Sequence, residues 1–249
     1  MSGRTTIIVP CYNEARRLNG DAFLQYARST PDVTFCFVDD GSTDETRSVL
    51  NDLARASDAI DLCALDRNGG KADAVRRGVL HALVSAPAYV GYWDADLATP
   101  LEMIAVFRSR LESNKDLRMV IGSRVALLGH EIDRKASRHY FGRLFATAAA
   151  ATLSMPVYDT QCGAKLLRVD ERTAQLFDQP FCVNWMFDVE LIARLKQQEG
   201  PARRAGAYLN EVPLSAWHDV AGSKVRATDG ARALRELYRI YRRYHGVAR

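Results

Sequence analysis

The sequence predicts an α/β fold with a mostly parallel central sheet flanked by helices, built as a single domain. In the first half of the chain, short apolar runs alternate with segments of helical periodicity, as they do in strand–helix–strand units. Polar residues that suit a phosphate, a sugar or a metal follow each of the first five apolar runs. Ligands of parallel sheets bind beyond the carboxyl ends of the strands, so we expect these polar segments to meet at one edge.

Each strand is expected where an apolar run is bounded by turn signals. The first half predicts strands at 5–9, 33–38, 60–65, 89–93 and 117–121, with helices at 14–29, 43–56, 71–84 and 100–113. The second half is less regular, and it predicts helices at 134–153, 186–197 and 226–245, a strand at 163–169 and an edge strand at 208–212.

The starts of two helices have their own signals. Asp44 and Glu45 favour the positive dipole end of the helix at 43–56, with Ser42 or Thr43 as its N-cap. Pro100 suits the first turn of the helix at 100–113, because its missing N–H is not needed there.

The chain has 249 residues, of which 47% are apolar and 26% are charged. This composition is ordinary for a soluble globular protein. The net charge of +4 permits anionic partners without selecting one; nucleic acid is not expected, because no recognised binding motif accompanies the charge. The N-terminus lacks the architecture of a signal peptide, and no apolar run approaches the length of a membrane span. Five cysteines without metal-ligand or redox spacing predict reduced thiols and a cytoplasmic protein, peripheral on the inner face of the membrane if it meets one.

The most informative stretch is the end of the fourth predicted strand, where Asp94 and Asp96 stand one residue apart. A strand end can aim two carboxylates at one point, and Mg²⁺ or Mn²⁺ prefers such oxygen ligands while keeping positions free for phosphate. Taken alone, an Asp-x-Asp of this kind is more often the turn that follows a strand. Its polar neighbours at the other strand ends favour a metal site.

Several motifs together resemble glycosyltransferase family 2 with the GT-A fold, over residues 5–125. Further segments resemble one branch of it, the dolichyl-phosphate glucosyltransferases with their bacterial polyprenyl-phosphate relatives. The family motifs are Ile7–Glu14, Val38–Asp44, Asn68–Lys71 and Asp94–Asp96, and the branch motifs are Gly122–Arg124, Asp159–Leu166 and Trp185–Glu190.

The resemblance implies an inverting transfer of a hexose, expected to be glucose, from a nucleoside diphosphate sugar, expected to be UDP-glucose, to a polyprenyl (dolichyl or undecaprenyl) phosphate. It implies a metal-dependent enzyme that uses Mg²⁺ or Mn²⁺. We expect a GT-A domain over 1–225, with a nucleotide-sugar half at 1–125 and an acceptor half at 126–225, followed by a basic amphipathic helix at 226–249.

For the donor, the resemblance assigns base and ribose binding to the first two strand-end loops and the diphosphate to a glycine-flanked lysine and the metal. Cys11 is expected to be packing only. In the alternative interpretation these residues have no role in binding: Asp39 is part of a turn, Lys71 is solvated, and Ser223 and Lys224 cap the last helix. The donor-binding candidates are Pro10, Tyr12, Glu14, Asp39, Lys71, Asp94, Ser223 and Lys224, with Asp94 and Asp96 also as metal ligands and catalytic residues. Ala98 stands where related mannosyl-phosphate synthases carry a further polar ligand, which water or a lone His218 would have to replace.

The acceptor argument depends on arginines, because a lipid phosphate is an anionic nucleophile that needs positive groups to position it rather than a strong base. Arg124 is the leading candidate for acceptor binding and catalysis. A solvated basic face is the alternative for the others, and a turn is the alternative for Asp159 and Gln161. The remaining acceptor candidates are Arg134, Arg138, Arg143 and Gln161.

Two other functions stay open. If the acceptor is a hydroxyl of a saccharide or lipid, Asp188 becomes the general base; with a phosphate acceptor it would orient sugar hydroxyls instead. A nucleotide-sugar-binding regulatory module is the alternative of another class, although it has little need of two metal-binding carboxylates. A nucleotidyltransferase lacks the glycine- and arginine-rich first loop that it would need.

The segment 226–245 interleaves arginines with aromatic and aliphatic residues, which suits an anionic membrane surface. A helix docked on the catalytic domain fits nearly as well, and a separate membrane protein is another route to a lipid acceptor.

Overall fold

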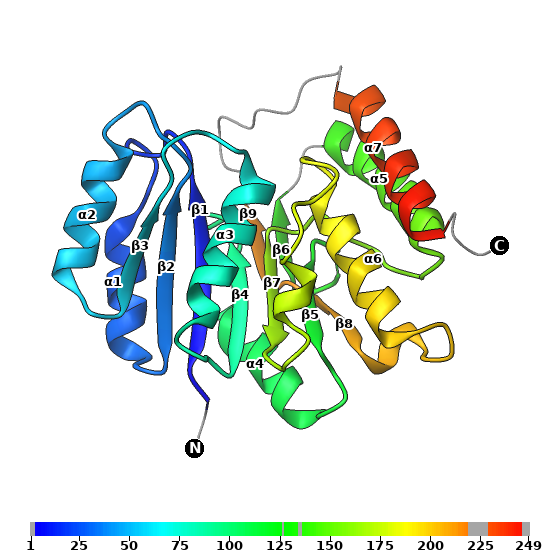
Figure 1. Ribbon diagram of the computed structural model, residues 1–249, viewed down its shortest axis with the longest axis horizontal. Coiled ribbons are helices and arrows are strands. Elements are labelled where there is room, and N and C mark those ends of the chain that lie inside the picture. Colours follow the sequence, from blue (N-terminus) through cyan, green and yellow to red (C-terminus); the bar gives the residue numbers. More distant parts are fainter. Residues whose placement is uncertain (1–2, 126, 134–135, 219–228, 246–249) are drawn as a thin grey trace.

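The computed structural model describes residues 3–125, 127–133, 136–218 and 229–245. It confirms an α/β domain built on a central seven-stranded sheet (Figure 1). The seven strands are β1 (Thr5–Cys11), β2 (Val33–Asp39), β3 (Ile60–Ala64), β4 (Tyr89–Trp93), β5 (Met119–Ser123), β7 (Ala164–Arg168) and β8 (Leu209–Pro213).

The strand order is β3-β2-β1-β4-β7-β5-β8, and β7 alone runs against its neighbours. The other neighbouring pairs are parallel, so six carboxyl ends lie along one edge. β8 is an edge strand, as the sequence predicts. Gly91 in β4 allows the close approach of β7, because a Cβ there would lie 2.2 Å from the carbonyl oxygen of Lys165.

Helices cover both faces of the sheet (Figure 1). Two separate apolar cores follow from this layering, one on each face. The first face is covered by α1 (Gly20–Ser29), α2 (Thr46–Ala56) and α4 (Met103–Ser113), and the second by α3 (Lys71–Leu83), α5 (Ala136–Leu153), α6 (Phe187–Glu199) and α7 (Asp229–His245).

Three helices of the first half begin at least three residues later than the sequence predicts. The first starts at Gly20 rather than at 14, since residues 14–18 form a turn and the side chain of Asn19 caps the N–H of Ala22. The second starts at Thr46, and its cap is neither Ser42 nor Thr43: the Asp44 carboxylate accepts the N–H of Thr46 instead.

The fourth predicted helix also starts late, at Met103, because Pro100 and Leu101 belong to the preceding turn. Two short strands were not predicted, β6 (Glu131–Asp133) and β9 (Ala216–His218), which pair with each other in a second sheet. Short three-residue strands give too little periodicity to be recognised.

α7 packs against α5 and α6 through Ala233, Leu237 and Ile240, which are buried (Figure 1). The helix is therefore docked on the domain, while its other face is exposed. Across the described part of the chain, no helix combines the length and the apolar character that crossing a bilayer requires.

Candidate active site

Asp94 occupies the carboxyl end of β4, at the centre of the sheet edge where the polar loops meet. Its N–H donates to the carbonyl oxygen of Gly163 (3.0 Å), which continues the pairing of β4 with β7. Its Oδ1 lies 2.5 Å from Nζ of Lys71. Gly163 leaves room for this carboxylate, because a Cβ at that position would lie 1.9 Å from Oδ2 of Asp94 and would displace it. The carboxylate is therefore fixed by strand pairing, by a lysine and by a residue without a side chain.

Asp96 stands next to Asp94 in a tight turn. Leu97 adopts a left-handed backbone (φ 54°), and the N–H of Ala98 donates to Oδ1 of Asp96 (3.1 Å). Burial and the charge of Asp94 raise the pKa of Asp96 above its usual range. Two carboxylates that repel one another, each with one oxygen not engaged by Lys71 or Ala98, are suitable ligands for a hard divalent cation.

Lys71 is the first residue of α3, and the glycine before it makes this possible. Gly70 has φ 86°, a conformation that favours glycine, and its backbone turns the chain into the helix. Burial would lower the pKa of Lys71, but Asp94, Asp188 and Asp96 outweigh that cost and raise it. The ammonium therefore stays charged, beside the N-terminus of a 13-residue helix, where an anion is stabilised.

A buried charge pair lies beneath this surface. Lys165 in β7 is fully buried, and its Nζ lies 2.6 Å from Oδ1 of Asp188, in the first turn of α6. Tyr92 stands opposite Lys165 in the strand register, and its hydroxyl donates to the same carboxylate oxygen. Burial and Asp188 raise the pKa of Tyr92 well above its usual value, so the hydroxyl keeps that proton.

Asp188 is thus held from two sides and nearly buried, with 7% of its side chain exposed. A general base needs hydrogen-bond access to the proton that it removes. The arrangement fits a carboxylate that positions its neighbours better than one that accepts a proton from an acceptor.

The first three strand-end loops are joined by hydrogen bonds. Asn13 adopts a left-handed backbone (φ 55°); its N–H donates to Oγ of Ser42 (3.1 Å), and its side chain accepts the N–H of Thr43 (2.9 Å). Asp40 accepts the N–H groups of Gly69 (2.7 Å) and Gly70 (2.8 Å) in the third loop. These contacts align the loops into one wall beside Lys71.

Asp39 ends β2 and is fully buried. It accepts the N–H of Ser42 (3.0 Å) and pairs with Nε of Arg47 (2.7 Å), whose Nη2 donates to the carbonyl oxygen of Leu65. Arg47 was not predicted, because a helix arginine has no distinctive sequence signal.

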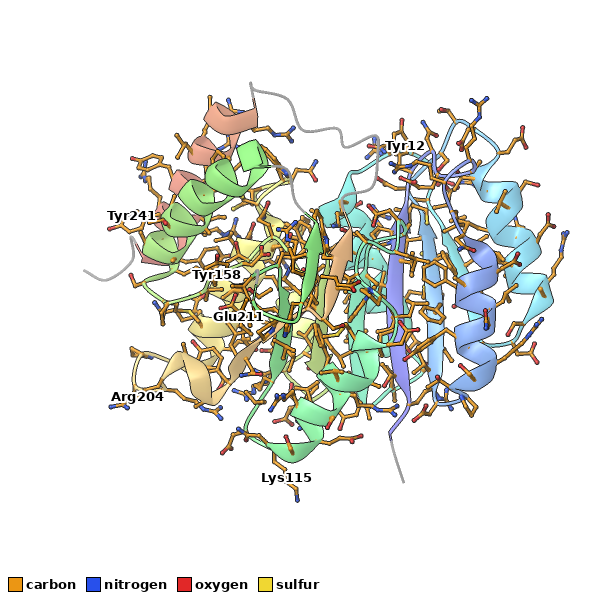
Figure 2. The ribbon with its side chains drawn as sticks, turned by 180° about the vertical axis from the view of Figure 1, so that it is seen from behind. Tyr12, Lys115, Tyr158, Arg204, Glu211 and Tyr241 are labelled. Carbon is orange, nitrogen blue, oxygen red and sulfur yellow. The ribbon has the colours of Figure 1, made fainter. Side chains whose placement is uncertain are left out.

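The other donor candidates of the first loop lie at this same end of the sheet. Pro10 belongs to β1, and Glu14 forms an ion pair with Arg17 (2.6 Å). Figure 2 shows Tyr12 beyond the end of β1, whereas Lys115 marks the opposite end of the sheet. The structure therefore brings Pro10, Tyr12 and Glu14 to the edge that carries Asp94.

Arg124 follows β5 and is held tightly by Asp159. Its N–H, Nε and Nη2 all donate to that carboxylate, at 3.1, 2.7 and 2.8 Å. Burial would raise the pKa of Asp159, but the charge and hydrogen bonds of Arg124 outweigh it and lower the pKa to about 2. The guanidinium also lies over the ring of Trp217 (5.5 Å). The charge of Arg124 is therefore already paired with Asp159, and Nη1 is the guanidinium nitrogen that does not donate to that carboxylate.

Unpartnered polar atoms gather around this pair. In the described part of the chain six buried side-chain polar atoms lack a hydrogen-bond partner. Three of them flank Arg124 and Asp159 in the sequence: Ser123 Oγ, Thr160 Oγ1 and Gln161 Nε2. Buried polar groups are nearly always satisfied, so this cluster indicates a place where a polar ligand or water binds.

Glu211 in β8 holds the same loop. Its two oxygens accept the N–H groups of Tyr158 (2.8 Å) and Asp159 (2.7 Å), and Figure 2 shows Tyr158 and Glu211 near each other.

Some predicted residues cannot be placed. Arg134, Ser223 and Lys224 lie outside the described residues. Arg138 and Arg143 lie on α5, but their side chains are outside the description, as is that of His218.

Glu236 of α7 is a further residue that the sequence did not reveal. It is buried, and its Oε2 accepts the N–H groups of Trp185 and Met186, both at 2.9 Å. These amides immediately precede α6, so α7 supports the helix that carries Asp188.

Comparison with known proteins gives a consistent set of relatives. Residues 6–171 match the model of glycosyl transferase family 2. The chain is 32% identical to a dolichyl-phosphate beta-glucosyltransferase of Trichomonas vaginalis over 237 residues, which cover 89% of this chain and 66% of that protein. It is 32% identical to the dolichyl-phosphate beta-glucosyltransferase of Mus musculus, over 88% of this chain and 69% of that one.

Solved structures with the same fold are more distant in sequence. Glucosyl-3-phosphoglycerate synthase from Mycobacterium tuberculosis, solved with Mn²⁺, UDP and glucosyl-3-phosphoglycerate, superposes with a TM-score of 0.68 at 14% identity, over 99% of this chain and 81% of that one. A mannosyltransferase from Pyrobaculum calidifontis, solved with GDP-Man and Mn²⁺, superposes with a TM-score of 0.61 at 18% identity. The match covers 90% of this chain and 59% of that one. The predicted GT-A fold is confirmed.

The Arg124–Asp159 pair generates a prediction about stability. Replacing Asp159 by Asn leaves a buried guanidinium unpaired, and we expect a loss of about 3 to 5 kcal/mol in the free energy of unfolding, measured with urea. Adding Arg124→Met should recover most of the loss, whereas Asp58→Asn, at an exposed position, should change little.

The pair also predicts the pH dependence of stability. Because the folded-state pKa of Asp159 is lowered, its contribution is fully present above the ordinary value of 3.8 and is lost as the pH falls towards about 2. Stability of the wild-type protein should therefore fall more steeply than that of the Arg124→Met/Asp159→Asn variant between pH 4 and pH 2. Identical acid profiles would contradict the pairing.

Proposed function

The chain belongs to glycosyl transferase family 2, and we propose that it moves glucose from UDP-glucose to a polyprenyl phosphate by a single inverting displacement. The observation that carries the proposal is the group formed by Lys71, Asp94 and Asp96 at the carboxyl edge of the sheet. One lysine and two carboxylates at this place suit a nucleoside diphosphate bound with a cation. The names of the relatives support the sugar and the acceptor.

On the donor side, we assign the wall of joined loops to the nucleotide. We assign the base and ribose to Tyr12 and Asp39, and we propose that Pro10 and Glu14 shape the first loop. Lys71 and the first turn of α3 bind the diphosphate. A divalent cation, Mg²⁺ or Mn²⁺, held by Asp94 and Asp96 would neutralise charge on the leaving nucleotide. Ser223 and Lys224 remain candidates for covering it.

On the acceptor side, we assign the phosphate to Arg124 through Nη1, together with Arg134, Arg138 and Arg143. Asp159 and Glu211 fix Arg124 in place, and Ser123, Thr160 and Gln161 offer buried polar atoms that a bound ligand would satisfy. We divide the domain accordingly, with 1–125 binding the donor and 126–225 the acceptor.

The burial of Asp188 favours a phosphate over a hydroxyl acceptor. A phosphate oxygen is already anionic and needs positioning, whereas an alcohol needs a base that can reach its proton. Asp188 pairs with Lys165 and accepts the hydroxyl of Tyr92. We propose that it serves the reaction by fixing these buried side chains beneath Lys71 and Asp94.

The exposed face of α7 supports contact with an anionic membrane, where a polyprenyl phosphate resides. Leu234, Tyr238 and Tyr241 are at least half exposed. A surface hollow of about 570 Å³ is lined by Cys182, Arg235, Tyr238, Arg239, Arg242 and Arg243. Aromatic rings with interleaved arginines suit the headgroup region of an acidic bilayer.

The central test is transfer of labelled glucose from UDP-glucose to undecaprenyl phosphate, with Mg²⁺, with Mn²⁺ and with EDTA. We expect label in the lipid phase that EDTA abolishes, loss of that label in Asp96→Ala, and normal transfer in the control Asp58→Ala. Transfer of glucose, with release of UDP, only to a saccharide or alcohol would refute the phosphate acceptor. Binding of UDP-glucose without any turnover would favour a regulatory module.

The role of Asp188 needs a variant that leaves no buried charge. In Lys165→Met/Asp188→Asn both partners are neutral, so we expect kcat/KM to fall by less than about tenfold if the acceptor is a phosphate. Loss of a general base would instead cost roughly a hundredfold to ten-thousandfold. A loss of that size in a folded double variant would return Asp188 to the role of base.

Membrane contact is tested by sedimentation with vesicles of neutral and of anionic phospholipid. The variant Arg235→Gln/Arg239→Gln/Arg242→Gln should bind anionic vesicles on the order of a hundredfold more weakly, at about 1 kcal/mol for each charge. The matched control, Arg28→Gln/Arg55→Gln/Arg110→Gln, removes three exposed charges from other helices and should bind like the wild type. Equal losses in both variants would contradict a site on α7.

A further inference from the structure

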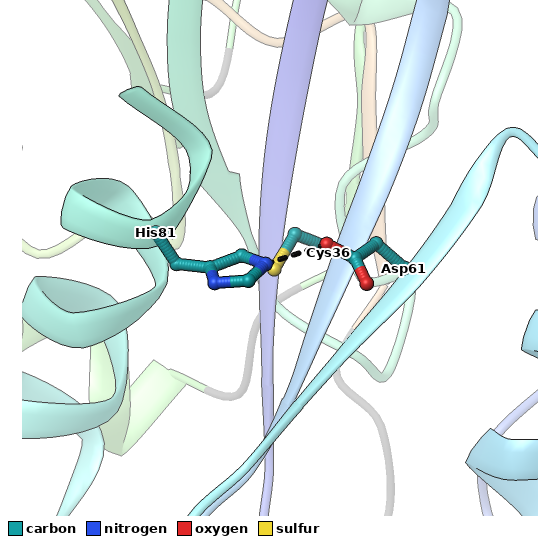
Figure 3. Close-up of side chains that lie close together, drawn as sticks. All are labelled: Cys36, Asp61 and His81. Atoms are coloured by element: carbon teal, nitrogen blue, oxygen red, sulfur yellow. Dashed lines mark hydrogen bonds and ion pairs between the residues drawn. The ribbon is translucent and has the colours of Figure 1, made fainter. Parts of the chain in front are cut away.

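Three side chains of types that can bind a metal converge away from the candidate active site, on the face of the sheet that α3 covers. Cys36 comes from β2, Asp61 from β3 and His81 from the last turn of α3 (Figure 3). One ligand atom from each lies within 4.8 Å of the other two. Nε2 of His81 already points at Oδ2 of Asp61, at 2.6 Å.

The fold explains why these residues meet. The register of the parallel pair β2–β3 places Cys36 directly opposite Asp61, so both side chains project from the same face of the sheet. α3 packs across β1 and β2 on that face, and its C-terminal turn brings His81 above the pair. The cluster is a product of strand register and helix placement, with no dependence on the loops that build the active site.

We propose that Cys36, Asp61 and His81 form a zinc site. A thiolate, an imidazole and a carboxylate are together the ligand set that Zn²⁺ prefers, whereas Mg²⁺ and Ca²⁺ avoid sulfur. The Cys36 thiol gives up its proton when the metal binds.

The geometry allows a tetrahedral ion with modest movement. In a tetrahedral site with zinc–ligand distances of about 2.0 to 2.3 Å, the ligand atoms lie about 3.3 to 3.8 Å from each other. The three ligand atoms here already lie within 4.8 Å of one another. The Asp61 and His81 side chains are 61% and 47% exposed, so they can separate to admit the ion, while buried Cys36 forms the floor. Water would complete the coordination, with Cys63 two residues beyond Asp61 on the same face of β3.

Such a site would join the edge strand to the helix. β3 ends the sheet and, among the described strands, pairs with β2 alone; an unprotected edge strand is a liability. Zinc bound by Cys36, Asp61 and His81 ties β3, β2 and α3 together, which makes its role structural and independent of Asp94 and Asp96.

The test uses the full chain, stripped with a chelator and loaded with Zn²⁺ or Co²⁺. Bound zinc is counted after gel filtration, and Co²⁺ reports thiolate ligation through its near-ultraviolet charge-transfer band. We expect His81→Ala and Asp61→Asn, at exposed positions that the core does not need, each to lose one bound zinc per chain. Cys36→Ala should abolish the thiolate band, and Cys182→Ser should retain both signals.

Two comparisons make the result decisive. Asp96→Ala should keep this zinc, since it lies in the other site, and Zn²⁺ should raise the thermal midpoint of the wild type but not of His81→Ala. Equal zinc content in the wild type and His81→Ala would overturn the proposal and leave only a hydrogen-bonded His81–Asp61 pair. A thiolate band that persists in Cys36→Ala and disappears in Cys63→Ser would overturn the assignment of Cys36.

Discussion

Three carboxylates, those of Asp94, Asp96 and Asp188, converge near the carboxyl edge of the central sheet, and their mutual repulsion requires positive charge among them. Lys165 supplies it from below, fully buried against Asp188, and Lys71 supplies it at the surface, 2.5 Å from Asp94. Removing either lysine would leave a carboxylate that burial and its neighbours disfavour. Among the described residues Asp96 forms no ion pair, and burial and the charge of Asp94 raise its pKa; a divalent cation would offset that excess of negative charge.

The rest of the site is organised around this balance. Asp40 and Asn13 tie the first three loops together, and Gly163 lets β7 approach Asp94. On the other side Glu236 holds the amides that precede α6, so the helix bearing Asp188 depends on α7. A helix with an exposed basic and aromatic face thus contacts the framework of the active site. This places the surface proposed to meet the lipid next to the machinery proposed to use it.

The sequence predicted the alternation of strands and helices, the edge position of β8 and the position of the polar loops at one edge of the sheet, because periodicity and strand-end polarity are local signals. It could not predict that β7 runs antiparallel, nor that Lys165 would face Asp188, since such contacts depend on the register of distant strands. Arg124 was predicted to bind the acceptor, but the sequence did not show that a carboxylate 35 residues away, Asp159, engages it. The Cys36, Asp61 and His81 cluster also comes from three separate elements, so cysteine spacing gave no hint of it.

The measurement that tests the central claim most directly is the affinity for UDP, by calorimetry, with Mn²⁺ and with EDTA. The account predicts that tight binding requires the cation, because Lys71 alone cannot balance two carboxylates and a diphosphate. It also predicts that Asp96→Ala removes the difference between the two conditions while the fold stays intact. Equal affinity with EDTA and with Mn²⁺ in the wild-type protein would contradict the role assigned to Asp94 and Asp96.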